Sequence, residues 1–207
     1  MDLEDRIHHQ HRETVAGMNV DELVKRCQDG DQLAWEVLVR TYQSRVYGIA
    51  YSYAGDRDEA RDLAQDTFIR VYRRIKSCRE PERFTTWLIQ VTRHVCIDHL
   101  RHRKARPAIH DLPVDDLRDL SSTEADPETD LEILKKKQLV YQGLRKLSTL
   151  NRDVIVLKEL QGLKITEIAE IMKVPAGTIK SRLNRARIEL ARILTGLMGE
   201  SNQGMLS

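Results

Sequence analysis

The segment from Ile165 to Leu183 reads ITEIAEIMKVPAGTIKSRL, two short helical patterns separated by a turn of a few residues. Two helices joined by so short a turn must cross closely, which favours a small residue such as Ala169 where they meet. Pro175 and Gly177 mark the start of the second helix. We expect a shared core made of Ile168, Met172, Val174, Ile179 and Leu183. This spacing is typical of a helix-turn-helix, whose second helix enters the major groove of DNA.

The outward face of that second helix is polar and cationic. It carries Thr178, Lys180, Ser181, Arg182, Asn184, Arg185 and Arg187. Arg and Lys side chains pair with guanine edges, Asn pairs with adenine, and hydroxyl groups bind phosphates. The plainer alternative is a solvated helix with ordinary surface charge. Between Lys173 and Arg192 there are six basic residues and one acidic residue, Glu189, and this excess favours nucleic-acid binding.

The net charge of +2 is unevenly distributed along the 207 residues. Residues 1–108 carry a net charge of +2, residues 109–134 carry −8, and residues 135–195 carry +9. A near-neutral front, an acidic middle and a basic end indicate three segments with different partners. The basic end is the one expected to bind DNA.

The composition predicts an all-α protein of two small helical domains. Aromatic residues make up 5% of the chain and charged residues 32%, and β-branched runs bounded by turns are scarce. No apolar run is long enough to span a bilayer, and residues 1–18 lack the apolar stretch of a signal peptide, so we expect no membrane insertion. The three cysteines, Cys27, Cys78 and Cys96, suit a reducing compartment, which predicts a cytoplasmic protein.

Four helices are predicted before residue 108, from apolar residues that recur at helical spacing. They span residues 21–29, 34–50, 58–75 and 85–103, with a loop over 76–83. In the third helix the inward residues are predicted to be Ala60, Leu63, Ala64, Phe68, Val71, Tyr72 and Ile75. In the fourth, Trp87 lies on the apolar stripe, so we expect it to pack in the core rather than stack on a base.

Four further helices are predicted after residue 130, over residues 131–147, 151–160, 165–172 and 176–197. The intervening residues 109–130 contain two prolines and many carboxylates without apolar periodicity, which predicts a flexible linker. The predicted organisation is therefore an N-terminal extension (1–18), a first domain (19–108), an acidic linker (109–133), a helix-turn-helix domain (134–197) and a tail (198–207).

Four motifs together resemble one family. They are DEARDLAQDTFIRVY from Asp58, FTTWLIQVTRHVCIDHLRHR from Phe84, LSTLNRDVIVLK from Leu147 and VPAGTIKSRLNRAR from Val174. In this order they resemble the extracytoplasmic-function sigma factors of bacterial RNA polymerase, over about residues 20–107 and 134–195. The resemblance implies a protein that binds core polymerase through the β′ clamp helices and the β subunit. It also implies recognition of the −10 and −35 promoter elements, promoter melting at a stress-type regulon, and control by an anti-sigma factor.

Within the first domain, the resemblance assigns two sets of residues. Asp62, Gln65, Asp66 and Arg70 project away from the apolar stripe of the third helix and are expected to dock on the β′ clamp helices. A merely solvated polar face is the alternative. The −10 set lies in the loop and the fourth helix and comprises Lys76, Ser77, Arg79, Arg83, Arg93, His94, Asp98 and Arg101. The loop is expected to hold a flipped base of the melted non-template strand.

In the second domain, the resemblance makes the helix-turn-helix the −35 reader. Lys180, Ser181, Asn184 and Arg185 match the family's base-reading positions, whereas Thr178, Arg182 and Arg187 lie to the sides, where phosphate contacts are expected. The acidic linker matches the connector that the family threads through polymerase channels. Its nine carboxylates would mimic nucleic acid there.

Two rival interpretations were weighed. A conventional helix-turn-helix regulator with a receiver-type sensor would show alternating strands and helices and an acidic phosphorylation site, and residues 20–107 show neither. A metal-dependent enzyme or redox sensor would use Cys78, Cys96 and the histidines His94, His99 and His102. These side chains do not converge on one helix face, since Cys96 and His94, two residues apart, point to different sides. No nucleophile–base pair or phosphate-binding loop is present, so we predict no enzyme activity, no metal and no cofactor.

Overall fold

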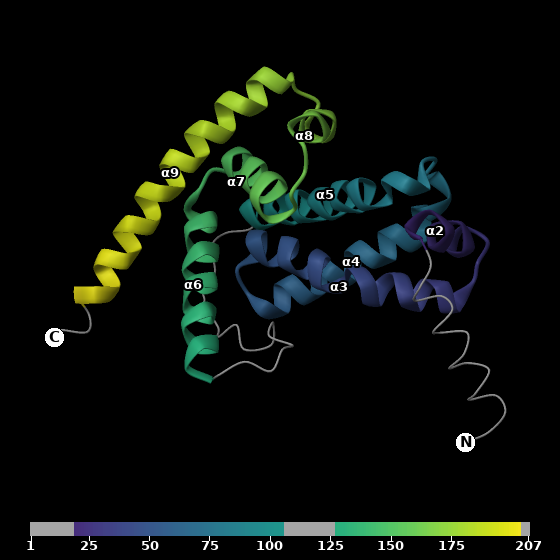
Figure 1. Cartoon of the computed structure of the whole chain (residues 1–207), viewed down its shortest axis with the longest axis horizontal. Coiled ribbons are helices and arrows are strands. Elements are labelled where there is room, and N and C mark those ends of the chain that lie inside the picture. Colours follow the sequence, from purple (N-terminus) through teal and green to yellow (C-terminus); the bar gives the residue numbers. More distant parts are fainter. Residues whose placement is uncertain (1–18, 106–126, 204–207) are drawn as a thin grey trace. The chain divides into compact units, whose positions relative to one another are not determined.

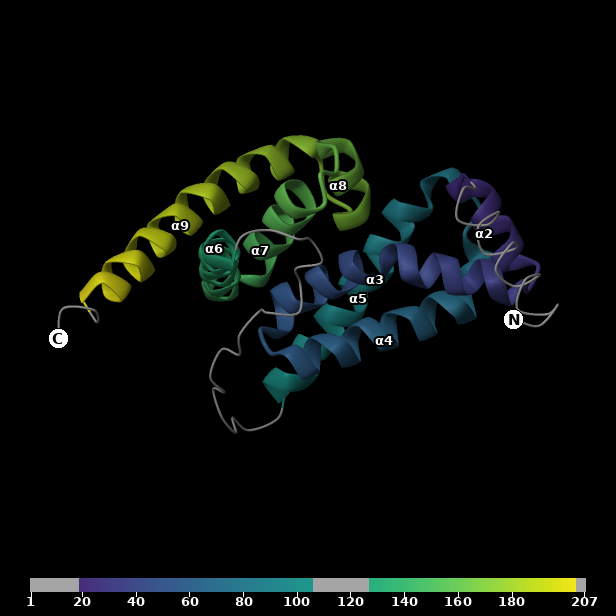
Figure 2. The same ribbon diagram turned by 60° about the horizontal axis from the view of Figure 1, so that its bottom comes forward.

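The computed structural model describes residues 19–105 and 127–203, and every regular element in these ranges is helical. The N-terminal part contains α2 (Val20–Gln28), α3 (Gln32–Ala54), α4 (Arg57–Arg74), the single-turn helices η1 (Ile75–Ser77) and η2 (Pro81–Arg83), and α5 (Phe84–Ala105). The C-terminal part contains α6 (Pro127–Lys146), α7 (Thr149–Ile155), the π-turn η4 (Val156–Leu160), α8 (Ile165–Met172) and α9 (Ala176–Gln203). Figures 1 and 2 show these helices. The predicted all-α class is confirmed.

The chain divides into two compact units. Among the described residues, the first comprises 19–50 and 61–105, and the second comprises 51–60 and 127–203. This grouping differs from the predicted domains in the assignment of residues 51–60. The predicted N-terminal extension and most of the predicted acidic linker lie outside the described residues.

The core of the first unit is formed by the apolar stripes of its helices. Leu23, Val24 and Cys27 of α2 are buried, together with Ala34, Leu38, Tyr42, Val46, Val71, Ile75, Phe84, Leu88 and Val91. Tyr42 joins α3 to α5, because its ring meets that of Phe84 edge-on at 5.3 Å and its hydroxyl lies 3.0 Å from the Thr85 Oγ1. Trp87 packs against this cluster, in keeping with the predicted packing role.

Tyr72 of α4 was predicted to point inward, and this is wrong: 65% of its surface is exposed. Val71 and Ile75 already occupy the buried face of α4, and Tyr72 is turned about 100° from Val71 around the helix. Its ring meets Trp35 of α3 edge-on at 5.1 Å at the margin of the core. Ile69 is also exposed, so α4 presents an apolar strip to solvent.

In the second unit, helix α9 packs against α6, α7 and α8, and Leu144, Val154, Leu157, Ile168 and Ile179 are fully buried. Arg152 of α7 is buried with them. Its guanidinium donates to the backbone oxygens of Leu144, Arg145 and Leu147 at 2.9, 2.7 and 3.4 Å. Helix ends leave carbonyl groups without intrahelical donors, so Arg152 closes the end of α6.

Several predicted helix bounds need correction, including that of α3, which spans Gln32–Ala54 rather than residues 34–50. Helix α6 begins at Pro127 rather than residue 131, since proline suits the first helical position, where its missing N–H is not needed. Residues 151–160 do not continue as one α-helix but change to the π-turn η4. Helix α9 extends to Gln203, beyond the predicted end at 197.

Candidate polymerase and promoter interfaces

The turn between α8 and α9 is built without glycine at its sharpest point. Lys173 adopts the left-handed conformation with φ 55°. Its N–H and that of Val174 donate to the backbone oxygens of Glu170 and Ala169, at 3.3 and 3.1 Å, which closes the C-terminus of α8. At the other end of α8, the Glu167 carboxylate accepts the N–H of Lys164 at 2.7 Å. Both ends of this short helix are therefore held by local hydrogen bonds.

Ile168, Ile179 and Leu183 are buried between α8 and α9, as predicted. Met172 and Val174 are only half-buried, while Ile171 is buried and was not predicted. Ile171 follows Ile168 by three residues, a spacing that places both on one helix face and could have identified it. The two helices thus form the expected helix-turn-helix core.

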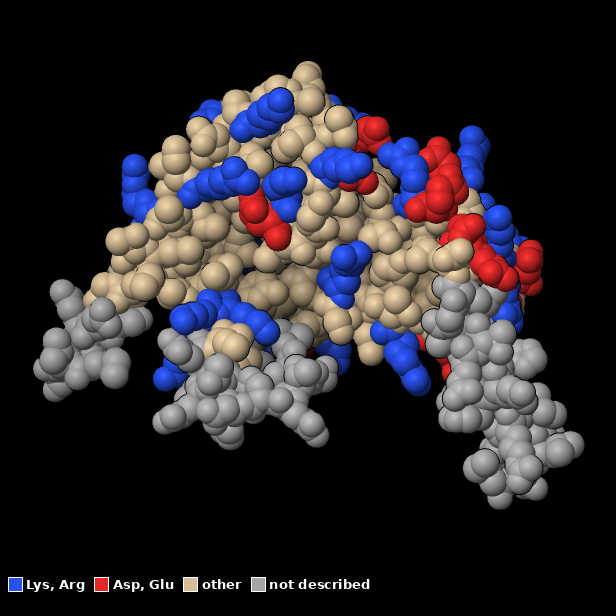
Figure 3. Space-filling model, viewed as in Figure 1, with Lys and Arg blue, Asp and Glu red and all other residues tan. Residues whose placement is uncertain are grey.

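The burial of Ile179, Leu183 and Ala186 defines which face of α9 is outward. Lys180, Ser181, Asn184 and Arg185 are exposed on that face, and Thr178 and Arg182 are half-buried beside it. In the space-filling view, Lys and Arg side chains stand at several places along α9 among uncharged residues (Figure 3). The predicted base-reading residues therefore share one accessible surface.

Arg187 is exposed but already has an acidic partner. Its Nε and Nη2 donate to one oxygen of Glu159, at 3.0 and 2.6 Å, which ties α9 to η4. The predicted phosphate contact of Arg187 must therefore share the guanidinium with Glu159.

On α4, Asp62, Gln65 and Asp66 are exposed opposite the buried Leu63 and Thr67. The same exposed surface contains Ile69 and Tyr72, which sequence analysis missed as surface residues. The available signal was helical spacing: Ile69 follows Gln65 and Asp66 by four and three residues, and Tyr72 follows Ile69 by three. Acidic, amide and apolar groups together make a surface able to bind a protein partner.

Arg70 of α4 and Arg101 of α5 lie on either side of Asp98. Their Nη1 atoms are 3.1 and 3.8 Å from the two carboxylate oxygens of Asp98. The structure thereby connects a residue predicted to bind polymerase with two residues predicted to bind the −10 element. All three side chains remain partly exposed.

The predicted loop over residues 76–83 contains two short helical turns, η1 and η2. The polar residues Lys76, Ser77, Arg79 and Arg83 are exposed. Ile75, Cys78 and Phe84 are buried and anchor the segment to the core. On α5, His94 and Arg101 are exposed and Arg93 is half-buried. These residues of the predicted −10 set are therefore at least partly accessible on the 76–83 loop and on α5.

Comparisons with known proteins identify both parts of the chain. A Sigma-70 region 2 family model matches residues 38–106, and a Sigma-70, region 4 model matches residues 137–190. The RNA polymerase sigma-H factor of Pseudomonas aeruginosa is 32% identical over 189 residues, covering 87% of this chain and 96% of that protein. The ECF RNA polymerase sigma factor SigW of Bacillus subtilis is 34% identical over 186 residues, covering 87% and 99%. The chain belongs to the extracytoplasmic-function sigma factors. It is thus a transcription initiation factor, as its four motifs predicted.

Solved structures support the sigma-factor fold. CnrH in complex with the cytosolic domain of CnrY matches with a TM-score of 0.62 at 24% identity, covering 86% of this chain and 97% of that one. RpoE in complex with the anti-sigma factor NepR from Bartonella quintana matches with a TM-score of 0.61 at 23% identity, covering 77% and 96%.

The cysteines of this sigma factor are buried thiols. Burial, assisted by the nearby Asp31 carboxylate, raises the pKa of Cys27 to about 12, and burial also raises the pKa of Cys78. Burial thus disfavours the thiolate form at both positions. Within residues 19–105 and 127–203, no group of three or more His, Cys, Asp or Glu residues is placed to hold a metal. In the same ranges no helix is long and apolar enough to cross a membrane.

Proposed function

We propose that this sigma factor divides promoter recognition between its two parts. The exposed face of α4 binds the β′ clamp helices of core polymerase, with further contacts to the β subunit. The 76–83 loop and α5 bind the −10 element, and α9 reads the −35 element. The sigma factor acts in the cytoplasm, without a metal, a cofactor or enzyme activity of its own. A conventional regulator is disfavoured, because residues 38–106 match Sigma-70 region 2.

The observation that carries the proposal is the separation of two surfaces on α4. Leu63, Thr67 and Val71 are buried in the unit, whereas Asp62 and Asp66 are exposed and remain available to a partner. Charge reversal on that face should therefore leave the fold intact and change only the binding of a partner.

The test is the affinity of the full-length protein for core polymerase. Asp62→Lys with Asp66→Lys should weaken binding at least tenfold, because like charges across an interface cost several kcal/mol. Glu22→Lys with Asp29→Lys is the matched control, since Glu22 of α2 and Asp29 directly after it are both exposed and the change in net charge is the same. Equal affinities of the two double variants would overturn the assignment of α4.

We also propose that an anti-sigma factor holds this protein inactive. Both structural relatives were solved as complexes, one with CnrY and one with the anti-sigma factor NepR. Co-purification from the native cells, before and after release of the sigma factor by stress, would identify the partner.

A further inference from the structure

Helix α2 precedes the region 2 match, which begins at residue 38, yet it packs against η1, η2 and α5. Its last residue, Gln28, reaches the loop that connects α4 to α5. The side-chain Nε2 of Gln28 donates to the backbone oxygens of Ile75 and Cys78, each at 2.9 Å. One amide group thus binds two carbonyl groups that are about 50 residues away in the sequence.

The two carbonyl groups stand at the two ends of one turn. Ile75 begins η1 and Cys78 follows it, and the N–H of Cys78 also donates to the Ile75 oxygen at 3.0 Å. Between them lie Lys76 and Ser77, both exposed. Because the Gln28 amide bonds to both ends of the turn, it restricts the backbone that carries these two side chains.

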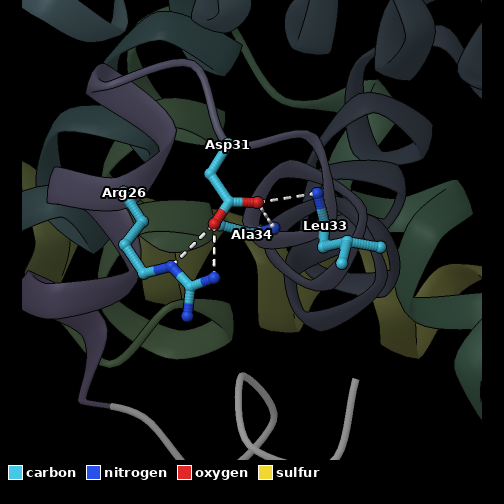
Figure 4. A network of polar contacts seen from close by, with 4 residues as sticks. All are labelled: Arg26, Asp31, Leu33 and Ala34. Carbon is cyan, nitrogen blue, oxygen red and sulfur yellow. Dashed lines mark hydrogen bonds and ion pairs between the residues drawn. The ribbon is translucent and has the colours of Figure 1, made fainter. Parts of the chain in front are cut away.

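Helix α2 is anchored in the first unit, which fixes the position of the Gln28 backbone. Leu23, Val24 and Cys27 are buried in the core of the first unit. Figure 4 shows how Asp31, just after α2, is bonded on both sides. Its carboxylate accepts from Arg26 of α2, with the Nε at 2.7 Å, and from the N–H groups of Leu33 and Ala34 at 2.9 and 3.1 Å. These bonds lock α2 to the start of α3.

We infer that Gln28 is a positioning residue for −10 recognition, and that α2 belongs to the promoter-reading part of this sigma factor. The inference rests on the proposed function of the 76–83 loop. Gln28 touches no base; it holds the turn that carries Lys76 and Ser77 in the conformation that accepts a flipped base. A pocket for a flipped base needs such rigid walls, because loosely held contacts lose discrimination.

The experiment uses holoenzyme assembled from core polymerase and the full-length protein. Fork-junction DNA with a randomised −10 non-template strand is bound, and the bound fraction is sequenced. Gln28→Met keeps the length of the side chain but removes both donors. Gln43→Met is the matched control, because Gln43 is exposed on α3 of the same unit. Gln28→Lys restores a donor at this position.

Gln28→Met should reduce the preference for one −10 base about tenfold, which is within the discrimination that one base contact provides. The other −10 positions and the affinity for core polymerase should not change. Gln28→Lys should recover a substantial part of the preference, and Gln43→Met should behave as the wild type. Should Gln28→Met fail to fold in thermal denaturation, Gln28→Ala replaces it, because water can then reach both carbonyl groups.

Two results would overturn the inference. Unchanged base preferences in Gln28→Met would show that −10 recognition does not depend on the Gln28 hydrogen bonds. An equal loss of binding to all sequences would show that Gln28 has a merely structural role. Failure of the proposed function looks different: wild-type holoenzyme would then show no base preference at any −10 position, and the inference would fall with it.

Discussion

The exposed residues of α9 differ in what they already contact. Arg187 is bonded to Glu159, and the Ser181 hydroxyl donates to the backbone oxygen of Thr178 at 3.0 Å. Within the described part of the chain, Lys180, Asn184 and Arg185 make no side-chain hydrogen bond or ion pair. These three side chains can bind DNA without first breaking an internal bond. They are therefore the residues on which we expect −35 specificity to depend most.

Arg185→Ala should weaken the free energy of binding to the matched −35 duplex by about 1–3 kcal/mol, because a bidentate base contact is lost. It should also relax the sequence preference at one base pair. Arg182→Ala should weaken binding similarly for matched and scrambled duplexes and lower the salt slope by about one, because one fewer phosphate is neutralised. Fluorescence anisotropy over a salt series measures both. An equal loss on both duplexes for Arg185→Ala would contradict the base-reading role.

At the scale of elements, the junction of α6 and α7 depends on one buried cation. Arg152 donates to three backbone oxygens at the end of α6, and Ser148 caps α7, where its Oγ accepts the N–H of Asn151 at 3.4 Å. Hydrogen bonds from a charged group are stronger than neutral ones, and a buried carbonyl group that loses its donor costs free energy. This junction places α7 against α9, so it supports the helix-turn-helix indirectly.

Arg152→Met should lower the free energy of unfolding by about 2–3 kcal/mol, because the carbonyl groups lose their donors while the apolar volume is largely kept. Arg187→Met is the matched control, since its ion pair with Glu159 is half-exposed and such pairs contribute less than about 1 kcal/mol. Urea denaturation followed by circular dichroism compares the two. Similar losses would show that the Arg152 hydrogen bonds add nothing beyond a surface ion pair.

At the scale of the whole molecule, charge is separated along the chain. Residues 109–134 carry a net charge of −8, whereas residues 135–195, which include the helix-turn-helix, carry +9. An acidic segment joined to a basic DNA-binding region reduces the positive electrostatic potential that attracts the DNA phosphates. The free protein should therefore bind DNA of arbitrary sequence weakly.

Replacing the nine acidic residues of 109–134 with Asn and Gln changes the net charge from +2 to +11. Affinity for a duplex of arbitrary sequence should rise at least several-fold at low salt. The gain should shrink as salt is added, because salt screens the electrostatic attraction between the protein and DNA. Anisotropy titrations at several salt concentrations measure it. A gain that does not depend on salt would point to a cause other than charge.

Much of this protein was determined by local sequence. Apolar spacing predicted the all-α class, the helix-turn-helix and the buried face of α9, because a helix places residues three and four apart on one side. The polar faces of α4 and α9 followed from the same periodicity. The family could be recognised because its motifs are short stretches that keep their order along the chain.

Tertiary structure decided what depends on the packing of distant elements. Tyr72 fits the apolar periodicity of α4, but Val71 and Ile75 take the place against the core and leave it exposed. The contact of Arg70 with Asp98 joins two helices, and the bonds from Gln28 cross to a separate loop. Hydrogen bonds between such distant residues need both partners at once, and no local pattern of residue types records where the second one lies.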